Sequence, residues 1–250
     1  MPRKARPESR TGYSHIIFRG VNRLNIFLDD EDRRIMLEAM GRFAPEAGAD
    51  VAAYCLMSNH VHLLLRVPEE GAAAMFVKKI ASSYVFHFNH KYGRIGHLFQ
   101  ERFKSEAVDD ERYLLTVFRY ILRNPEKAGI CPTQDFPWSS FRELAGEAGI
   151  CQMQPLLDAA GGRAALVKFV LLPNDDKCLE ADEGRRLSDE EALAVVREVA
   201  GSRLGLLPNL PIRDRNSLLL QMSRRGVSVP QLVRLTGVSR NVAFHAVKSG

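Results

Sequence analysis

Hydrophobic and polar positions along the first half of the chain repeat with two different periods, which predicts strands and helices in a definite order. Apolar residues alternate, or run continuously over a few positions, in four stretches that we expect to be strands: residues 13–18, 51–56, 60–67 and 105–108. Apolar residues recur every three or four positions in three stretches that we expect to be helices: residues 29–44, 70–90 and 110–123. Pro45 and Gly48 are expected to end the first helix, and Pro125 the third.

The resulting order is strand, helix, strand, strand, helix, strand and then a further helix, which predicts an α+β fold. It matches the ferredoxin-like arrangement, an antiparallel sheet with helices on one face. His60 and His62 would lie on a central strand, and because alternate residues of a strand share a face, their rings would point the same way. The other face of such a sheet would stay open for a ligand.

The periodic pattern weakens after residue 145 and resumes near residue 187. We therefore expect a first domain at 1–145, a connector at 146–186 and an all-α C-terminal domain at 187–250. Helices are expected there at residues 189–200, 214–225, 229–235 and 240–248, with caps at Ser188, Ser228 and Ser239. A helix, a turn at Gly237 and a second helix are typical of a helix-turn-helix domain.

The charge of this last segment favours DNA binding. From residue 213 onward it carries seven basic residues and one acid. Arg240, Asn241 and His245 would face the groove of duplex DNA. The alternative is a small helical bundle with a basic surface.

Composition narrows the class of protein. Hydrophobic residues make up 46% of the 250 residues and charged residues 26%, as in an ordinary soluble globular protein. No membrane span or signal-peptide pattern is expected. Four scattered cysteines without a Cys-x-x-Cys pair fit reduced thiols in the cytoplasm. The net charge of +5 and the pI of about 9.1 permit a polyanionic partner.

Four residues carry the candidate chemistry. His60 and His62 would offer two imidazoles on one strand, and Asn124 follows Tyr120 by four residues, so these two would share a helix face. Imidazoles and an amide oxygen suit a divalent cation, Mg²⁺ or Mn²⁺, and a phenol can attack a phosphate that a cation polarises. The structural alternatives are a solvated strand face, a core tyrosine and a helix-ending asparagine. Tyr113 lies on nearly the same helical face, but only Tyr120 has an amide four residues later.

Four motifs in order carry a resemblance. They are Met-Ser-Asn-His-Val-His-Leu-Leu at 57–64, Gly-His-Leu-Phe-Gln-Glu-Arg-Phe at 96–103, Arg-Tyr-Ile-Leu-Arg-Asn-Pro at 119–125 and Phe-Pro-Trp-Ser-Ser-Phe at 136–141. Together they resemble the single-tyrosine His-hydrophobe-His transposases, in particular the REP-associated branch, over residues 12–144. Two departures are mild: Ser58 replaces a frequent proline, and Phe99 stands where tryptophan is usual.

This resemblance implies a function and a site. His60 and His62 match the metal-binding pair, Asn124 the third metal ligand and Tyr120 the nucleophile. The family cleaves single-stranded DNA near a hairpin, forms a 5′-phosphotyrosine and frees a 3′-hydroxyl. Its members act as monomers or as homodimers, and either state is open for this chain.

Basic and aromatic residues near the expected site suggest where DNA would lie. Phe99 could stack on an unpaired base, while Arg102 and Lys104 meet phosphates. Arg19 and Arg23 could grip a hairpin stem. The alternative is a surface loop anchored by its aromatic side chains.

Two other functions stay open at this point. One is a domesticated, non-catalytic DNA-binding regulator of repeat sequences. The other is a metal-dependent nuclease that uses water in place of tyrosine.

Overall fold

The computed structural model describes residues 9–67, 69, 71–100, 102–174, 176, 178–179, 187 and 189–248. The chain divides into two compact units, residues 1–181 and 182–250, each with its own hydrophobic core. The expected cap at Ser188 lies outside the described residues. In the part of the chain that the structure describes, no helix combines the length and the apolar character needed to cross a membrane.

The first unit is built on one four-stranded antiparallel sheet. Its strands are β1 (Tyr13–Arg19), β2 (Asp50–Met57), β3 (His60–Arg66) and β4 (Lys104–Val108), in the order β2-β3-β1-β4. This is the ferredoxin-like arrangement expected from the alternation of periods. The first and third strands therefore lie side by side at the centre of the sheet.

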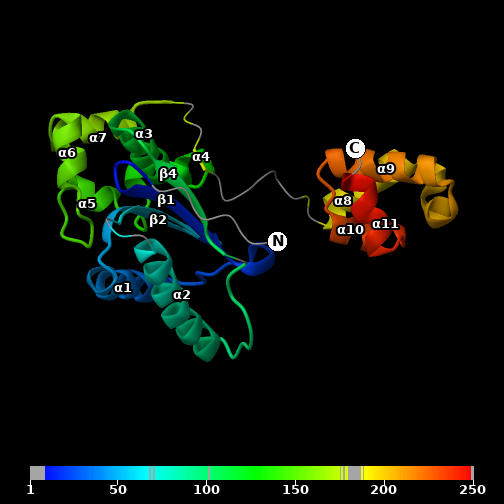
Figure 1. The fold of residues 1–250 in the computed structure, drawn as a ribbon, viewed down its shortest axis with the longest axis horizontal. Helices are drawn as coiled ribbons and strands as arrows, with labels where there is room; N and C mark the ends of the chain where they lie inside the picture. Colours follow the sequence, from blue (N-terminus) through cyan, green and yellow to red (C-terminus); the bar gives the residue numbers. More distant parts are fainter. Residues whose placement is uncertain are drawn as a thin grey trace. The chain divides into compact units, whose positions relative to one another are not determined.

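Helices α1 (Asp30–Glu46) and α2 (Ala72–Lys91) cover one face of this sheet (Figure 1). The predicted stripe of α2 is in the core: Phe76, Ile80, Tyr84 and Phe88 are at most 1% exposed. Asp29 caps α1 by accepting the Asp32 backbone N–H. The expected end of α1 at residue 44 is wrong by two residues, because the helix continues through Pro45 to Glu46; Gly48, with a φ of +61°, lies just beyond it.

The other face is covered too, which corrects the expectation of helices on one face and an open second face. Helix α3 (Glu111–Leu122) packs there and leads into the short α4 (Asn124–Lys127) (Figure 1). Within the stretch expected to be a connector, α6 (Gln154–Ala160) and α7 (Arg163–Leu171) bury Leu156, Leu166 and Val170 against the same core. Much of this stretch is thus part of the first unit.

Shorter elements complete the first unit: η1 (Val21–Arg23), η2 (Thr133–Asp135) and α5 (Phe141–Ala145). The segment around Trp138 runs along the outer edge of β2. The Leu56 N–H donates to the Trp138 carbonyl at 2.8 Å and the Ser140 N–H to the Tyr54 carbonyl at 3.0 Å. This segment closes the β2 edge of the sheet, which would otherwise expose unpaired backbone groups.

The second unit is helical in its described residues. It contains α8 (Asp189–Ala200), the 3₁₀ segment η3 (Gly201–Asn209), α9 (Ile212–Arg224), α10 (Val229–Thr236) and α11 (Arg240–Lys248). Gly237 takes a φ of +73° in the turn between the last two helices, a backbone conformation that favours glycine. Ala243 and Ala246 face the core of this unit, whereas Arg240, Asn241, Phe244 and His245 are exposed.

Candidate active site

The candidate site lies on the sheet face that α3 covers. Alternation places His15 of β1, His60 and His62 of β3, and Lys104 and Glu106 of β4 on this face, together with Leu64, which packs in the α3 core. The strand register pairs Ile17 with both His62 and Lys104, and His15 with both Leu64 and Glu106. The histidines therefore stand in the middle of the sheet, with a basic and an acidic side chain beside them.

Helix α3 carries Tyr120, and Asn124 begins the short α4 that follows. The Tyr120 ring centroid lies 5.9 Å from those of His15 and His62. The rings of His60 and His62 are 4.9 Å apart. The Asn124 amide nitrogen donates to the Tyr120 carbonyl at 3.0 Å, and Asn124 is only 9% exposed. Tyr120, His60 and His62 thus lie together in space, and Asn124 follows Tyr120 by one helical turn.

The hydrogen bonds around these residues suit a divalent cation. The Asn59 side-chain nitrogen, Nδ2, lies 3.5 Å from the Arg23 carbonyl oxygen. The Asn59 side-chain oxygen, Oδ1, lies 2.6 Å from His60 Nδ1. With the amide in this orientation, His60 Nδ1 must donate, so the lone pair of His60 is on Nε2. In the same way, the bond from the Asn124 amide nitrogen directs Oδ1 away from the backbone. Two imidazoles and an amide oxygen are neutral groups of the kinds that bind divalent cations.

Burial keeps the central histidines neutral. It lowers the pKa of His62 well below its ordinary value, and the neighbouring His60, His15 and Lys127 act in the same direction. Burial also lowers the pKa of His15, although Glu106 opposes this shift. Within the described residues, no group of three or more His, Cys, Asp and Glu side chains forms a metal-binding cluster.

Tyr113 lies in a different environment from Tyr120. Its pKa is raised, first by burial and then by its hydrogen bond with Glu106. Tyr120 instead faces the two buried histidines and has the Lys127 Nζ 4.8 Å from its ring centroid. Tyr120 therefore lies beside the candidate ligand His62, with its side chain buried at 5% exposure, whereas Tyr113 lies beside Glu106.

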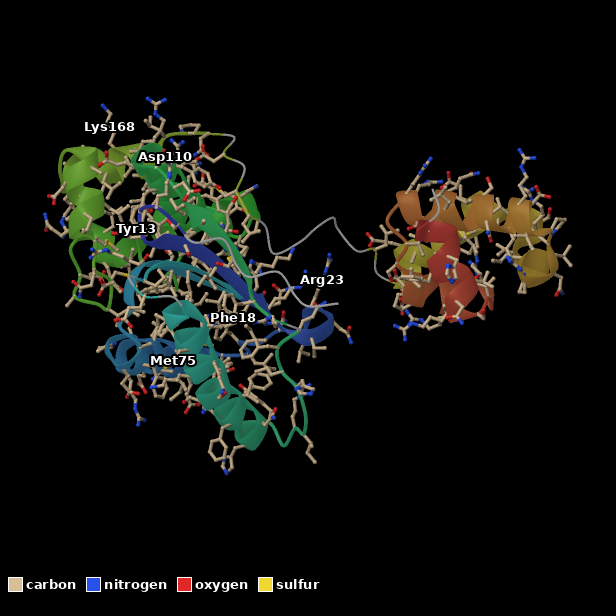
Figure 2. All side chains as sticks on the ribbon, in the orientation of Figure 1. Tyr13, Phe18, Arg23, Met75, Asp110 and Lys168 are labelled. Atoms are coloured by element: carbon tan, nitrogen blue, oxygen red, sulfur yellow. The ribbon has the colours of Figure 1, made fainter. Side chains whose placement is uncertain are left out.

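The residues expected to contact DNA lie at one end of the sheet. Arg19 pairs with His60 in the register, and Arg23 follows in the turn beyond Phe18 (Figure 2). Backbone bonds join this turn to the loop before β4: the Val21 N–H donates to Leu98 and the Gln100 N–H to Arg19, both at 2.8 Å. The turn and the loop therefore form one surface next to His60.

The side chains of this surface differ in how exposed they are to solvent. Arg102 is exposed, and Lys104 is half-buried at the start of β4. Phe99 packs edge-on against Phe18 with ring centroids 5.2 Å apart, which makes it an anchor of the loop. Its predicted contact with a DNA base stays a prediction.

Three residues of the site were not identified in the sequence. His15 and Glu106 could have been found by asking which polar residues of the other strands share the histidine face. Lys127 follows Tyr120 by seven residues, a spacing that returns to the same side of a helix. This spacing could have predicted that Lys127 lies near Tyr120, because α4 almost continues α3.

Comparisons with known proteins show what this chain is similar to. Residues 9–124 match the model of a family described as IS200-like transposase. A Haemophilus influenzae protein named as a REP-associated tyrosine transposase is 27% identical over 110 residues, which cover 39% of this chain and 62% of that protein. The match thus spans less than two thirds of the length of this relative.

A solved structure shares the fold of this chain. A REP-associated tyrosine transposase bound to a REP hairpin aligns over its whole length and 75% of this chain, with a TM-score of 0.54 and 19% identity. A Deinococcus radiodurans protein named as a transposase aligns over 45% of this chain and 91% of its own, with a TM-score of 0.35 and 18% identity. Residues 9–124 of this chain thus match the IS200-like transposase family model, and the chain shares the fold of a solved REP-associated tyrosine transposase.

Proposed function

We propose that the first unit is a metal-dependent single-strand DNA endonuclease and strand transferase that acts on hairpin DNA. The observation that carries this proposal is the position of Tyr120 beside His62 of the central strand, which in turn lies beside His60; Asn124 follows Tyr120 by one helical turn. The relative whose structure matches this fold is bound to a REP hairpin, which supports hairpin DNA as the partner.

In the proposed reaction, the Tyr120 oxygen attacks a DNA phosphorus and its phenolic proton passes to water. A phosphotyrosine ester forms at the 5′ end of the downstream strand, the bond from phosphorus to the 3′ oxygen breaks, and that oxygen takes up a proton from water and leaves as a 3′-hydroxyl. A cation held by His60, His62 and Asn124 would polarise the phosphate. Because one phosphoester replaces another, a free 3′-hydroxyl can reverse the step and rejoin strands without ATP.

Residues around the site would hold the DNA. Arg19, Arg23 and Arg102 are suited to phosphates of the hairpin, since guanidinium groups bind phosphate oxygens in pairs. Lys127, 4.8 Å from the Tyr120 ring, would favour the developing phenolate. These roles follow from position and charge.

The second unit would bind duplex DNA. Its helix α11 presents Arg240, Asn241, Phe244 and His245 to solvent on the turns that are not packed on the core. Arginine and asparagine are the side chains that pair with guanine and adenine edges in the major groove. This surface supports a helix-turn-helix role for α10 and α11.

The test of the proposal is a covalent-adduct assay. Full-length protein is incubated with end-labelled single-stranded hairpin DNA, with Mn²⁺ or with EDTA, and resolved on a denaturing gel. We expect a protein-linked fragment only with Mn²⁺, lost in Tyr120→Phe and kept in the matched control Tyr113→Phe. Hairpin binding by the wild type without any adduct would support the non-catalytic regulator instead. Cleavage that persists in Tyr120→Phe without a linked product would support a nuclease that uses water.

A further inference from the structure

His15 and Glu106 form a polar row that leads to the candidate metal ligand His62. His15 Nε2 lies 3.1 Å from His62 Nδ1, and Glu106 Oε2 lies 3.9 Å from the other nitrogen of the same ring, His15 Nδ1. His15 and His62 are 0% and 1% exposed, respectively. Nothing in the reaction proposed above uses His15 or Glu106.

The nitrogen of His15 that carries the proton determines which nitrogen of His62 is protonated. A neutral imidazole has one N–H and one lone pair, so the His15–His62 contact needs one ring to donate and the other to accept. His15 Nδ1 is a buried nitrogen without a hydrogen-bond partner at normal distance, and the Glu106 carboxylate faces it. A lone pair on Nδ1 would point at a negative charge, whereas an N–H there would point at an acceptor. The carboxylate thus places the His15 proton on Nδ1.

The rest of the row follows from that proton. His15 Nε2 then carries the lone pair and accepts the Nδ1–H of His62. His62 is left with its lone pair on Nε2, the nitrogen on the far side of the ring from His15. The tautomer of His60 is set similarly by the Asn59 oxygen, 2.6 Å from His60 Nδ1. Each candidate ligand histidine thus has its own acceptor at Nδ1.

We propose that Glu106 and His15 are positioning residues that hold His62 in the Nδ1–H tautomer and so present its Nε2 to a divalent cation. This inference rests on the proposed function in one respect only, namely that His62 binds a divalent cation. Outer partners that fix a ligand histidine typically change metal affinity about 10–100-fold when they are removed. Glu106 is itself held in place: the Leu179 N–H donates to its Oε2 at 3.1 Å, and Tyr113 is its other neighbour.

The test compares Glu106→Gln with the wild type in the full-length chain. The glutamine keeps the shape, but its NH₂ can donate to His15 Nδ1, so the opposite tautomer becomes accessible. Long-range ¹H–¹⁵N NMR of metal-free protein reports which nitrogen of His62 carries the proton. We expect Nδ1–H in the wild type and a mixture, or Nε2–H, in Glu106→Gln. We also expect Mn²⁺ affinity, measured from the free-ion EPR signal, to fall about 10–100-fold.

Two variants separate positioning from a general loss of structure. Tyr113→Phe removes another contact of Glu106 and should leave the His62 tautomer unchanged. Glu111→Gln makes the same chemical change at an exposed position of α3 and should change neither readout. An Nε2–H tautomer in the wild type, or an unchanged tautomer and Mn²⁺ affinity in Glu106→Gln, would overturn the inference.

The outcome is separable from that of the proposed function. If the wild type forms the Tyr120 adduct while Glu106→Gln leaves His62 unaffected, the function stands and the positioning role falls. If no adduct forms but tautomer and Mn²⁺ affinity respond as expected, the positioning role stands and the proposed reaction falls.

Discussion

The ion pair between Arg119 and Asp176 should stabilise the helix that carries Tyr120. Arg119 Nε and one amino nitrogen lie 2.6 and 2.8 Å from the two carboxylate oxygens of Asp176, a two-pronged contact. The side chains are 13% and 15% exposed, and the guanidinium stacks 4.1 Å from the Phe169 ring centroid. Asp176 thus fastens the segment after α7 to α3, next to the proposed nucleophile.

We expect Asp176→Asn to destabilise the first unit by about 1.5–3 kcal/mol, the usual worth of a hydrogen bond to a charged group that is mostly out of water. The cost arises because the substitution leaves the Arg119 charge without its counter-ion in a nearly buried position. At a slope of about 2 kcal/mol per M, the urea midpoint should fall by about 1 M. The single tryptophan of the chain, Trp138, lies in the first unit, so its fluorescence follows that unit alone.

The control is Glu46→Gln, which removes the exposed pair between Glu46 and Lys79, with side chains 44% and 35% exposed. Solvent screens this pair, so the urea midpoint should hardly move. Equal effects of the two substitutions, or a midpoint unchanged by Asp176→Asn, would refute the idea that the residues after α7 hold α3.

Three further predictions follow from other contacts. Gly20→Ala should lower the melting temperature at a cost of roughly 1–3 kcal/mol, because a Cβ there would lie 2.2 Å from the Leu24 carbonyl oxygen; unchanged thermal unfolding would contradict this. The pKa of the Asp29 carboxyl is lowered to about 2, first by Lys91, so its contribution to stability is present above the ordinary pKa of 3.8 and is lost as the pH falls toward 2. Lys91→Met should therefore make stability depend less on pH over this range. Urea midpoints measured at several acidic pH values test this, and an unchanged dependence of the midpoint on pH would contradict it. Arg240→Ala should weaken duplex DNA binding by about 1–3 kcal/mol and relax its sequence specificity; fluorescence anisotropy with duplexes of different sequence measures both, and an equal loss for all sequences would remove Arg240 from the base contacts.

Much of the first unit could be predicted because its elements are long and regular. The buried stripe of α2 and the alternation in β3 each identify their element, and the order of elements then leaves the ferredoxin-like sheet as the simple solution. The juxtaposition of His60, His62 and Tyr120 followed from alternation on a strand and from motif order. These features depend on local pattern, which a sequence displays directly.

The covering of the second face could not be predicted in the same way. Helices α6 and α7 have 7 and 9 residues, and Gly161 and Gly162 separate them. So few turns show no clear period, and glycines are typical of a connector, so the burial of Leu166 and Val170 depends on tertiary packing.

The role of His15 was hidden for a related reason. Alternation shows that His15 and Ile17 share a face of β1, but not which residues of β3 and β4 lie opposite them. That depends on register, which turns and long-range packing set. Only the pairing of His15 with Glu106 and its contact with His62 reveal the polar row.

Identification of the residue that becomes linked to DNA is the most direct measurement. Wild-type protein is trapped with single-stranded hairpin DNA and Mn²⁺, digested with nuclease and protease, and the peptides are sequenced by mass spectrometry. We predict a nucleotide attached through its 5′ phosphate to Tyr120, absent when EDTA replaces Mn²⁺. A nucleotide on Tyr113, or cleaved DNA with no modified peptide, would contradict the proposal that Tyr120 is the nucleophile.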